Sequence, residues 1–423
     1  MDIGVIGAGY VGLVQAAGLA SIGHRVRLAE ANEDRVDQLR AGDVPIYESG
    51  LDELMHDAVA SGRLTFHTEN VEAVEGSDVV FLCLPTPPGV DGAADVTIVE
   101  RVARQIGEMA GEPILVVKST VPVGTCARLE KRMAGRARIV SNPEFLREGS
   151  AVEDFLRPDR VVVGSRDDAA GDSVEEAYRP LGARVVRTDL TSAELIKYGS
   201  NAYLAARLTF VNALANIAES VDADILDVVE GMGLDRRIGP HFLRPGPGYG
   251  GSCFPKDTIA LLATSRQAGY EFTLLQTVVD ADRSQRHWIV GNLRRMVGGD
   301  LSEARIAMWG IAFKAGTDDT RESPAIKIAH MLSSEGAEIV AYDPEAPAPH
   351  PITAADDPLS AVSEADVLLV ATEWPEFTTV DMRRVAERMR GTIVYDVRNL
   401  LDHAAVEAAG LRYHGLGRRG FGT

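Results

Sequence analysis

A glycine-rich segment directly after the first apolar run constrains the fold of this chain most strongly. Residues 3–6 have the pattern of a short buried strand, and residues 7–12 read GAGYVG. A helical pattern then continues to about Ser21, and a second strand pattern over 26–30 ends in Glu30. The order of strand, G-x-G-x-x-G, helix, strand and acid is typical of the first half of a doubly wound α/β domain.

The individual residues of this segment have separate physical roles. We expect Gly7 to allow the tight turn, Gly9 to let a pyrophosphate approach the backbone, and Gly12 to let helix and strand pack closely. The first helical turn, which contains Tyr10 and Val11, presents backbone amides and a positive partial charge to phosphates. These five residues are therefore predicted to bind a dinucleotide.

Glu30 indicates which dinucleotide is bound. It lies eighteen residues after Gly12 and can accept hydrogen bonds from both ribose hydroxyls. Because an acid at this position disfavours a 2′-phosphate, the sequence predicts NAD and not NADP. A glycine-rich turn without any ligand is the alternative, and the complete strand, helix and acid context argues against it.

Further buried-type strands follow at 79–84, 114–117 and 160–163, separated by gaps of helix length. This alternation indicates the α/β class. Residues 191–230 then have helical periodicity with almost no breakers, and Thr191 to Glu194 has the form of a capping box. A helix of this length usually links domains or builds a subunit interface.

A second strand series begins after the helical region, at 306–310, 338–343, 367–370 and 392–396, with a helix over about 324–335. It predicts a second α/β unit that lacks the G-x-G-x-x-G. The chain is therefore expected to divide into residues 1–190, 191–298 and 299–423.

Composition excludes several classes of function. The chain has 43 Lys and Arg against 62 Asp and Glu, a formal net charge of −19, which repels nucleic-acid phosphates. It contains no long apolar run and no signal-peptide pattern at its start, so neither a membrane span nor export is expected. Three widely spaced cysteines suggest a reducing compartment, and a cytoplasmic protein without metal or disulfides is predicted.

The most specific chemical segment is 250–257, which reads GGSCFPKD. Pro255 suits a first helical position, so Cys253 should lie just before a helix N-terminus, which favours the thiolate form. Asp257, four residues further on, falls on the same helix face. A lone cysteine is more often a buried small apolar side chain, but the glycines, the proline and the acid together predict a nucleophile.

Other candidate catalytic residues lie on the long helix and in loops after strands. Lys197 and Asn201 are four residues apart on one helix face and could stabilise an oxyanion. Thr120 follows the strand at 114–117, and Glu144 and Glu148 are a pair of carboxylates, one of which could activate water. Taken singly, the helical pair and the two acids would be read as solvated surface groups.

Two further loops are candidates for ligand binding. Thr86 follows the strand at 79–84 and could contact the cofactor, although a turn made rigid by prolines is equally consistent with its sequence. Lys314 and Arg321 follow the strand at 306–310, where the second unit has no glycine motif. Two such cations suit a nucleoside diphosphate.

Taken together, these segments resemble the UDP-glucose/GDP-mannose dehydrogenase family. The similar segments run in family order over nearly the whole chain: GAGYVG (7–12), STVPVGT (119–125), NPEFLREG (142–149), ELIKYGSNAY (194–203), RIGPHFLRPGPGYGGSCFPKD (237–257), GIAFKAGTDDTRESPA (310–325) and YDVRN (395–399). The resemblance implies two Rossmann-like doubly wound domains joined by a long central helix that also forms a dimer or larger homo-oligomer.

The implied reaction converts UDP-glucose, two NAD⁺ and water into UDP-glucuronate. In it, Cys253 attacks an aldehyde to form a thiohemiacetal, and oxidation leaves a thioester that water hydrolyses. The resemblance assigns Lys197 and Asn201 to the oxyanion, Asp257 and Thr120 to water or proton handling, and Glu148 to the hydrolytic base. Glu144 is implied to support Thr120.

The resemblance also assigns ligand contacts. For NAD it adds Arg35, Thr86, Thr120 and Arg321 to the glycine motif and Glu30. Arg237 is implied to reach the substrate of a neighbouring subunit, and Arg398 to contact nucleotide and sugar. The remaining sugar-nucleotide contacts are expected from three segments and the catalytic groups already named: Glu144, Phe145, Leu146, Glu148, Lys197, Asn201, Phe242, Leu243, Tyr249, Gly250, Gly251, Phe313 and Lys314.

Some residues depart from the family pattern, and other readings stay open. Glu30 stands where an aspartate is usual, Ser49 replaces a usual proline, and Thr86 follows Leu-Pro where Val-Gly is usual. GDP-mannose is a rival substrate, as are N-acetylated UDP-hexosamines, whose enzymes usually have histidine where this chain has Ser252. A catalytically silent sugar-nucleotide-binding protein is the alternative from another class.

Overall fold

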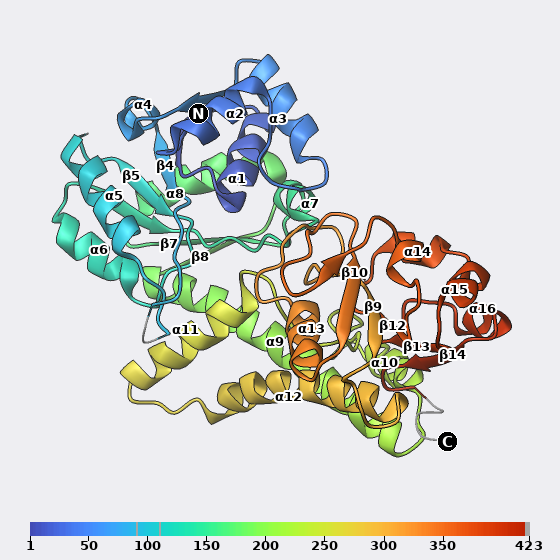
Figure 1. Ribbon diagram of the computed structural model, residues 1–423. Coiled ribbons are helices and arrows are strands. Elements are labelled where there is room, and N and C mark those ends of the chain that lie inside the picture. Colours follow the sequence, from blue (N-terminus) through green and yellow to red (C-terminus); the bar gives the residue numbers. More distant parts are fainter. Residues whose placement is uncertain (90–91, 110, 419–423) are drawn as a thin grey trace. The chain divides into compact units, whose positions relative to one another are not determined.

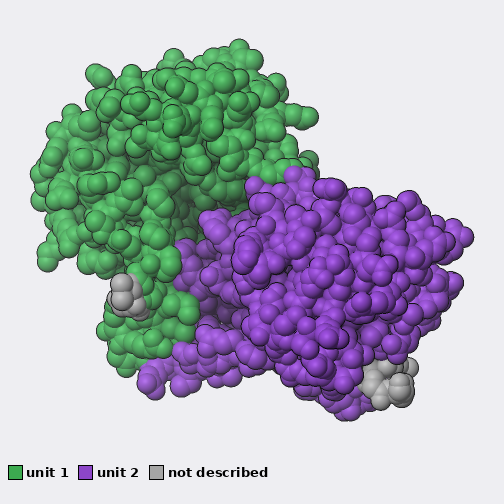
Figure 2. Space-filling model, viewed as in Figure 1, with its two compact units in different colours: residues 1–200, 259–270 green, residues 201–258, 271–423 purple. Residues whose placement is uncertain are grey.

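The chain consists of two compact units, which Figure 2 shows in different colours. Unit 1 comprises residues 1–200 and 259–270, and unit 2 comprises residues 201–258 and 271–423. The structure is a computed structural model and describes residues 1–89, 92–109 and 111–418. In this described part, no helix is both long enough and apolar enough to cross a membrane.

Within the described residues, unit 1 contains one eight-stranded sheet with the order β3-β2-β1-β4-β5-β6-β7-β8. Figure 1 labels β4, β5, β7 and β8 of this sheet. Neighbouring strands are parallel except β6 and β7. The first six strands have the order of a doubly wound dinucleotide-binding domain. The strands are β1 (Asp2–Ile6), β2 (Arg25–Ala29), β3 (Leu64–His67), β4 (Val79–Leu82), β5 (Ile114–Val117), β6 (Arg138–Ser141), β7 (Val161–Ser165) and β8 (Val185–Thr188).

Helices cover both faces of this sheet, because alternate strand residues build two separate apolar clusters. Ile3 and Val5 pack with Leu13 of α1 on one face, whereas Ile6 packs with Val99 of α5 on the other. Burial on both sides explains the continuous apolar runs of the central strands. The helices are α1 (Tyr10–Ser21), α2 (Glu33–Ala41), α3 (Leu51–Ala60), α4 (Asn70–Val74), α5 (Thr97–Met109), α6 (Thr125–Met133), α7 (Ala151–Leu156), α8 (Asp168–Tyr178) and the 3₁₀ turn η1 (Arg179–Leu181).

The long helix α9 (Leu190–Ser220) supplies residues to both units. The prediction of helix throughout 191–230 was wrong beyond Ser220. The backbone of Asp222 adopts a left-handed conformation with φ of 55°, and the side chain of Asp224 caps the separate helix α10 (Ile225–Gly233) by accepting from the amide of Leu226. Aspartate tolerates the left-handed region and is a favoured N-cap, so the chain breaks here without glycine or proline.

The predicted capping box at Thr191 to Glu194 was also wrong. Asp189 caps α9 instead, and its carboxylate accepts from the amides of Thr191 and Ser192, each at 2.9 Å. Because the helix begins at Leu190, Glu194 lies beyond its first turn and cannot cap it. Its carboxylate accepts from the amides of Gly124 and Cys126 at the start of α6.

Unit 2 repeats the arrangement of unit 1 on a smaller scale. Among the described residues its parallel sheet has the order β11-β10-β9-β12-β13-β14, which is the doubly wound order again and confirms the predicted second Rossmann-like domain. The elements are α10, α11 (Phe254–Gln267, shared with unit 1), α12 (Thr273–Met296), β9 (Arg305–Trp309), α13 (Pro324–Ser334), β10 (Glu338–Tyr342), β11 (Thr353–Ala354), α14 (Pro358–Ala361), β12 (Val367–Val370), η2 (Pro375–Thr379), α15 (Met382–Arg388), β13 (Ile393–Asp396), α16 (His403–Ala408) and β14 (Arg412–Gly415).

Candidate active site

The glycine-rich loop of unit 1 joins β1 to α1. Gly7 has φ of 101°, a conformation that glycine adopts freely. A Cβ atom on Gly12 would lie 1.8 Å from the carbonyl oxygen of Gly7, whereas a Cβ on Gly9 would meet no described atom within 4 Å. Gly12 is therefore required by packing within the fold. Gly9 leaves backbone accessible to a ligand.

Glu30 and Arg35 both contact this loop through Ala8. The Glu30 carboxylate lies directly after β2 and accepts from the backbone amides of Ala8 at 2.9 Å and Asn32 at 3.0 Å. The Arg35 guanidinium donates to the Ala8 carbonyl at 3.2 Å. An acid beside an open glycine and a helix N-terminus is the arrangement that a dinucleotide ribose and pyrophosphate require, so these residues fit the cofactor.

The two glycines predict different defects when each is replaced by alanine. We expect Gly12→Ala to destabilise unit 1, because its new methyl group collides with backbone and not with a movable side chain. We expect Gly9→Ala to fold normally but to bind NAD at least about tenfold more weakly, since the methyl group occupies the ligand side of the loop. Thermal melting and NAD titration of both variants check this, and a normally folding Gly12→Ala would contradict it.

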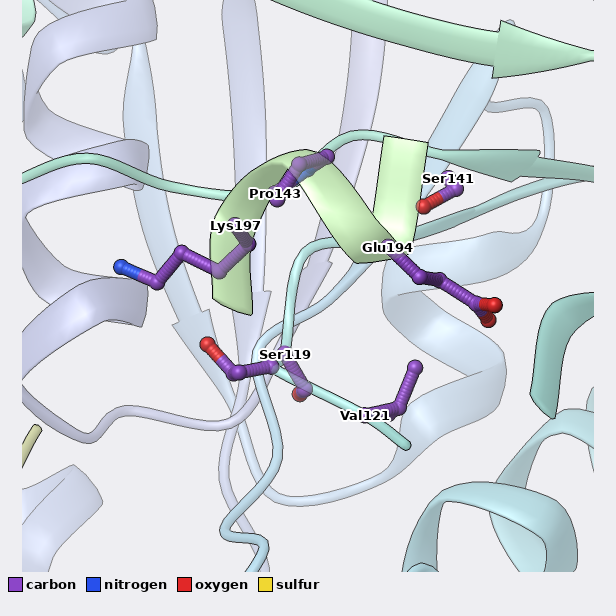
Figure 3. A pocket seen from close by; sticks show the side chains of 7 residues that line it. Ser119, Val121, Ser141, Pro143, Glu194 and Lys197 are labelled. Atoms are coloured by element: carbon purple, nitrogen blue, oxygen red, sulfur yellow. The ribbon is translucent and has the colours of Figure 1, made fainter. Parts of the chain in front are cut away.

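Thr86 and Thr120 lie in the loops that follow β4 and β5. The Thr86 hydroxyl donates to the Thr120 carbonyl at 2.9 Å, so the two loops are joined. Thr120 also lines a small pocket that follows β5 and β6, at the carboxyl edge of the sheet, where ligands of such folds bind. Figure 3 shows this pocket. The pocket is lined by Ser119, Thr120, Val121, Ser141, Pro143, Glu194 and Lys197.

Lys197 and Glu144 form a buried ion pair in unit 1. The Lys197 Nζ donates to Glu144 Oε1 at 2.7 Å, and their side chains are only 3% and 6% exposed. The second oxygen of Glu144 accepts from the amide of Leu146. Burial alone would raise the pKa of Glu144, but the charge and hydrogen bond of Lys197 keep that pKa below its usual value. The sequence did not predict this pair.

The rest of the 142–149 segment extends the same site. It forms a loop after β6 in which Glu144 is buried and Glu148 partly buried, so neither is a fully solvated surface acid. The ring of Phe145 lies 5.5 Å from Lys197 Nζ and stacks against the guanidinium of Arg160. Leu146 and Glu148 are partly buried. In unit 1, Thr120 and Lys197 therefore line one pocket, and Lys197 contacts the 142–149 loop.

Cys253 lies in unit 2, immediately before the first residue of α11. Pro255 is the second helical residue, one position later than predicted. The carbonyl of Cys253 accepts from the amide of Asp257 at 2.8 Å, and the Cys253 side chain is partly exposed. A cysteine immediately before a helix N-terminus lies near its positive end, a position that favours a thiolate.

Asp257 connects the first turn of α11 to α9. Its carboxylate is 1% exposed and accepts from Asn201 Nδ2 at 2.7 Å and from Lys256 Nζ at 2.7 Å. The structure therefore brings Asn201 and Asp257 into direct contact beside the cysteine turn. Lys256, which sequence reasoning did not single out, compensates the buried charge.

The loop before Cys253 contains an aromatic group and is held by buried polar side chains. The ring of Phe254 lies 6.3 Å from that of Phe242 and 6.2 Å from that of Tyr249. Phe242 has φ of 57°, which is rare for a bulky residue and occurs at functional loops. Asp282 on α12 accepts from the amide of Tyr249 at 2.9 Å. Leu243 is buried.

Gly250 and Gly251 pack against Phe313, which follows β9. A Cβ on Gly250 would lie 3.1 Å from the Cβ of Phe313, and one on Gly251 would lie 2.8 Å from the Phe313 ring. The Arg398 guanidinium donates to the Phe313 carbonyl at 3.0 Å. Lys314 Nζ lies 5.6 Å from the Phe313 ring centre. Five residues predicted to bind substrate are thus gathered in unit 2.

Two predicted ligand-binding arginines have exposed side chains. Arg237 pairs with Asp235 at 2.6 Å, and Arg321 pairs with Asp319 at 2.7 Å. The backbone carbonyl of Arg321 accepts from the amide of Gly251, which places its chain beside the cysteine loop. The ligands assigned to both arginines stay predictions.

Sequence reasoning missed the buried acids that hold the site loops together. Glu194 fixes the start of α6, Asp282 fixes Tyr249, and Glu48 accepts from the amides of Gly149 and Ala151. Burial raises the pKa of Glu194 above its usual value. Their partners lie 33 to 103 residues away in sequence, so no local pattern could have identified them.

The comparisons with known proteins agree with this architecture. Models of the UDP-glucose/GDP-mannose dehydrogenase family match residues 1–182 (NAD binding domain), 191–284 (central domain) and 307–403 (UDP binding domain). A UDP-glucose 6-dehydrogenase of Pseudomonas aeruginosa is 41% identical across 99% of this chain and 98% of its own length.

Two solved structures are similar over almost the same length. A UDP-glucose dehydrogenase of Pyrobaculum islandicum has a TM-score of 0.91 at 37% identity, covering 98% of this chain and 97% of that one. A UDP-D-ManNAc dehydrogenase of Pyrococcus horikoshii has a TM-score of 0.88 at 28% identity, covering 99% of both. This chain therefore belongs to the UDP-glucose/GDP-mannose dehydrogenase family.

Proposed function

We propose that this chain is an NAD-dependent UDP-glucose 6-dehydrogenase, which oxidises the C6 alcohol of UDP-glucose to the carboxylate of UDP-glucuronate. The observation that carries the proposal is the cysteine turn. Cys253 stands at the N-terminus of α11, and the buried Asp257–Asn201 contact lies one helical turn further on. The similarity to curated UDP-glucose 6-dehydrogenases over nearly the full length supports the same substrate.

The proposed chemistry uses a covalent bond to Cys253. NAD, when bound at the glycine-rich loop, would accept a hydride from C6 in each of two oxidations, the first of which converts the C6 alcohol to the aldehyde with release of the hydroxyl proton. The Cys253 thiolate attacks the C6 aldehyde and forms a C–S bond, and the carbonyl oxygen takes up a proton to give a thiohemiacetal. Its oxidation leaves a thioester. Water then adds to the thioester carbon, the C–S bond breaks, and carboxylate and thiol are released.

The polar groups around these steps have distinct proposed roles. Lys197 and Asn201 stabilise the negative charge that develops on the C6 oxygen. Asp257 and Thr120 orient water and hold its protons, and Glu148 is the base that activates water for hydrolysis. Glu144 holds Lys197 in position through the buried ion pair, which supports the assignment of Lys197 to an anionic oxygen.

The sugar nucleotide is assigned mainly to unit 2. The loop that contains Phe242, Leu243 and Tyr249 is proposed to hold the sugar. Gly250 and Gly251 are proposed to contact it through backbone atoms, since Phe313 fills the space that a side chain would take at each. Lys314 and Arg398 supply positive charge for the diphosphate. Phe313 supports this assignment, because it contacts both glycines and accepts from Arg398 through its carbonyl.

The substrate assignment is tested by offering three sugar nucleotides separately. We expect kcat/KM for UDP-glucose to exceed the values for UDP-N-acetylglucosamine and GDP-mannose by at least about a hundredfold, the discrimination expected of a site built to bind one polar ligand. A preference for another sugar would keep the reaction and change the substrate. Tight binding of UDP-glucose without NADH formation would overturn the enzymatic proposal.

We also propose a homodimer built on α9. Tyr203, Phe210 and Ile217 occur at seven-residue spacing on this helix and are 63%, 57% and 56% exposed. A stripe of large apolar side chains at this spacing is typical of a helix that packs against another helix. A second copy of the same helix would cover it symmetrically.

The replacement Phe210→Asp is expected to convert the dimer to a monomer, because it places a charge at the centre of the stripe. Size-exclusion chromatography with light scattering measures the mass directly. Val59→Asp is the matched control, since Val59 is an exposed valine of α3 in unit 1 and 42% accessible. A Phe210→Asp protein that keeps the wild-type mass would refute the proposed interface.

The division into residues 1–190, 191–298 and 299–423 is kept as part of the proposal. In this division, the first part binds NAD, the second carries the long helix and the cysteine turn, and the third binds the UDP-sugar. A cytoplasmic location, where NAD and sugar nucleotides are available, belongs to the same proposal.

A further inference from the structure

Glu48 is a buried carboxylate of unit 1 to which the proposed reaction assigns no role. It lies in the loop before α3 and is 6% exposed. Its Oε2 accepts from the Tyr10 hydroxyl and, at 2.6 Å, from the backbone amide of Gly149. Its Oε1 accepts from the amide of Ala151 at 2.7 Å. Both carboxylate oxygens are therefore engaged by protein donors.

The three donors come from two segments that serve different steps. Tyr10 belongs to the glycine-rich motif and is the first residue of α1, next to Gly9, whose backbone is open to a ligand. Gly149 ends the 142–149 loop and directly follows Glu148. One carboxylate thus joins the cofactor loop to the loop that carries the proposed hydrolytic base.

The charge of this base also acts on Tyr10. Burial is the largest cause that raises the pKa of Tyr10, followed by the hydrogen bond to Glu48 and by the negative charges of Glu48 and Glu148. The hydroxyl therefore remains a proton donor at neutral pH. Any movement of Tyr10 changes what Glu48 can offer to Gly149, because both bonds use the same oxygen.

We propose that Glu48 is a positioning residue that couples the glycine-rich loop to the 142–149 loop, so that a dinucleotide seated on Gly9 and Tyr10 fixes Glu148 for thioester hydrolysis. The catalytic purpose of this coupling rests on the proposed function, whereas the coupling itself rests on the three hydrogen bonds of Glu48. An acid that served only to cap α7 would accept hydrogen bonds from the amides of Gly149 and Ala151 alone. The additional bond from the Tyr10 hydroxyl is what connects Glu48 to the glycine-rich loop.

Hydrogen–deuterium exchange with NAD alone tests the coupling. In the wild-type protein, saturating NAD is expected to slow exchange in peptides covering 145–156. Tyr10→Phe keeps its own backbone amide and both amide bonds of Glu48, and at NAD concentrations that saturate the variant this slowing is expected to be lost. Tyr342→Phe is the matched control, because it removes a tyrosine–glutamate hydrogen bond on unit 2 and should respond like wild type. A Tyr10→Phe protein with wild-type slowing would overturn the coupling.

Kinetics test the catalytic purpose. With UDP-glucose and NAD, Tyr10→Phe and Glu48→Gln are expected to accumulate the Cys253 thioester, seen by intact-mass spectrometry after acid quench. For Glu48→Gln, steady-state turnover should fall about tenfold while the first oxidation is unchanged, the loss expected from one hydrogen bond to a charged group. Equal slowing of every step, without accumulation, would reduce Glu48 to a structural role.

The two sets of results separate this inference from the proposed function. Because the exchange experiment needs no turnover, wild-type slowing by NAD without NADH formation from UDP-glucose would keep the coupling and refute the function. Normal two-step oxidation with no effect of Tyr10→Phe would keep the function and refute the coupling. If Glu48→Gln does not fold, Tyr10→Phe alone carries both measurements.

Discussion

Cys253→Ser is expected to lower steady-state NADH formation from UDP-glucose by about a thousandfold or more. Serine lacks the nucleophilicity of a thiolate and gains little from a helix N-terminus, so the second oxidation loses its covalent intermediate. The quenched variant should show no thioester mass increment. Cys253 is suited to this role because it is partly exposed and immediately precedes α11.

The matched control for this variant is Cys126→Ala. Cys126 is fully buried in α6, and burial raises the pKa of its thiol well above the usual value, so it cannot act as a nucleophile near neutral pH. This control should retain turnover within a fewfold of wild type. A Cys253→Ser protein with turnover within tenfold of wild type would refute covalent catalysis.

Lys197→Met is expected to destabilise unit 1 by about 3–5 kcal/mol at pH 7, because it leaves the carboxylate of Glu144 buried without its cation. In the wild type, the lowered pKa of Glu144 contributes stability that is present above the unfolded pKa of about 4.3 and is lost as pH falls through the folded pKa. The difference between wild type and variant should therefore be largest near pH 7 and narrow toward pH 4.

Urea unfolding at pH 7 and pH 4 measures this difference. The double variant Glu144→Gln with Lys197→Met removes both charges and is expected to recover much of the lost stability, although it should stay inactive. If Lys197→Met is as stable as wild type at pH 7, or if the gap widens as pH falls, the buried ion pair does not have the energetic role assigned to it.

Local sequence signals were sufficient for the elements around the cofactor loop. Strands β1, β5 and β12 were predicted from continuous apolar runs. Such runs occur because a strand that is covered on both faces does not alternate between apolar and polar residues. The spacing of the glycines then predicted the turn between β1 and α1, and the position of Glu30 after the second strand predicted the acid beside it. The structure places Glu30 against Ala8, as an acid assigned to that loop requires.

Other elements lacked such signals. Strand β8 at the edge of the sheet is half-exposed and contains an arginine, so its pattern does not stand out from a loop. The break after α9 depends on Asp222 and Asp224. Aspartate also occurs on the exposed faces of helices, so these two residues alone do not indicate a break. Burial of Glu48 and Glu194 depends on backbone amides more than sixty residues away. Only the assembled fold brings these donors together.

The site residues divide in the same way. Motifs pointed to Cys253, Asp257, Lys197 and Asn201 as single positions. The structure adds which of them are partners: Asn201 donates to Asp257, and Lys197 donates to Glu144. The roles of these residues stay predictions, since they concern ligands. The division of the chain into three parts also stays a prediction.

The most direct test of the proposed function is the number of NADH molecules formed per UDP-glucose consumed. A four-electron oxidation through a Cys253 thioester predicts two NADH for each UDP-glucose, with UDP-glucuronate as the product and no free aldehyde. One NADH for each UDP-glucose, with the aldehyde as the product, would contradict the proposal and leave the protein a two-electron alcohol dehydrogenase.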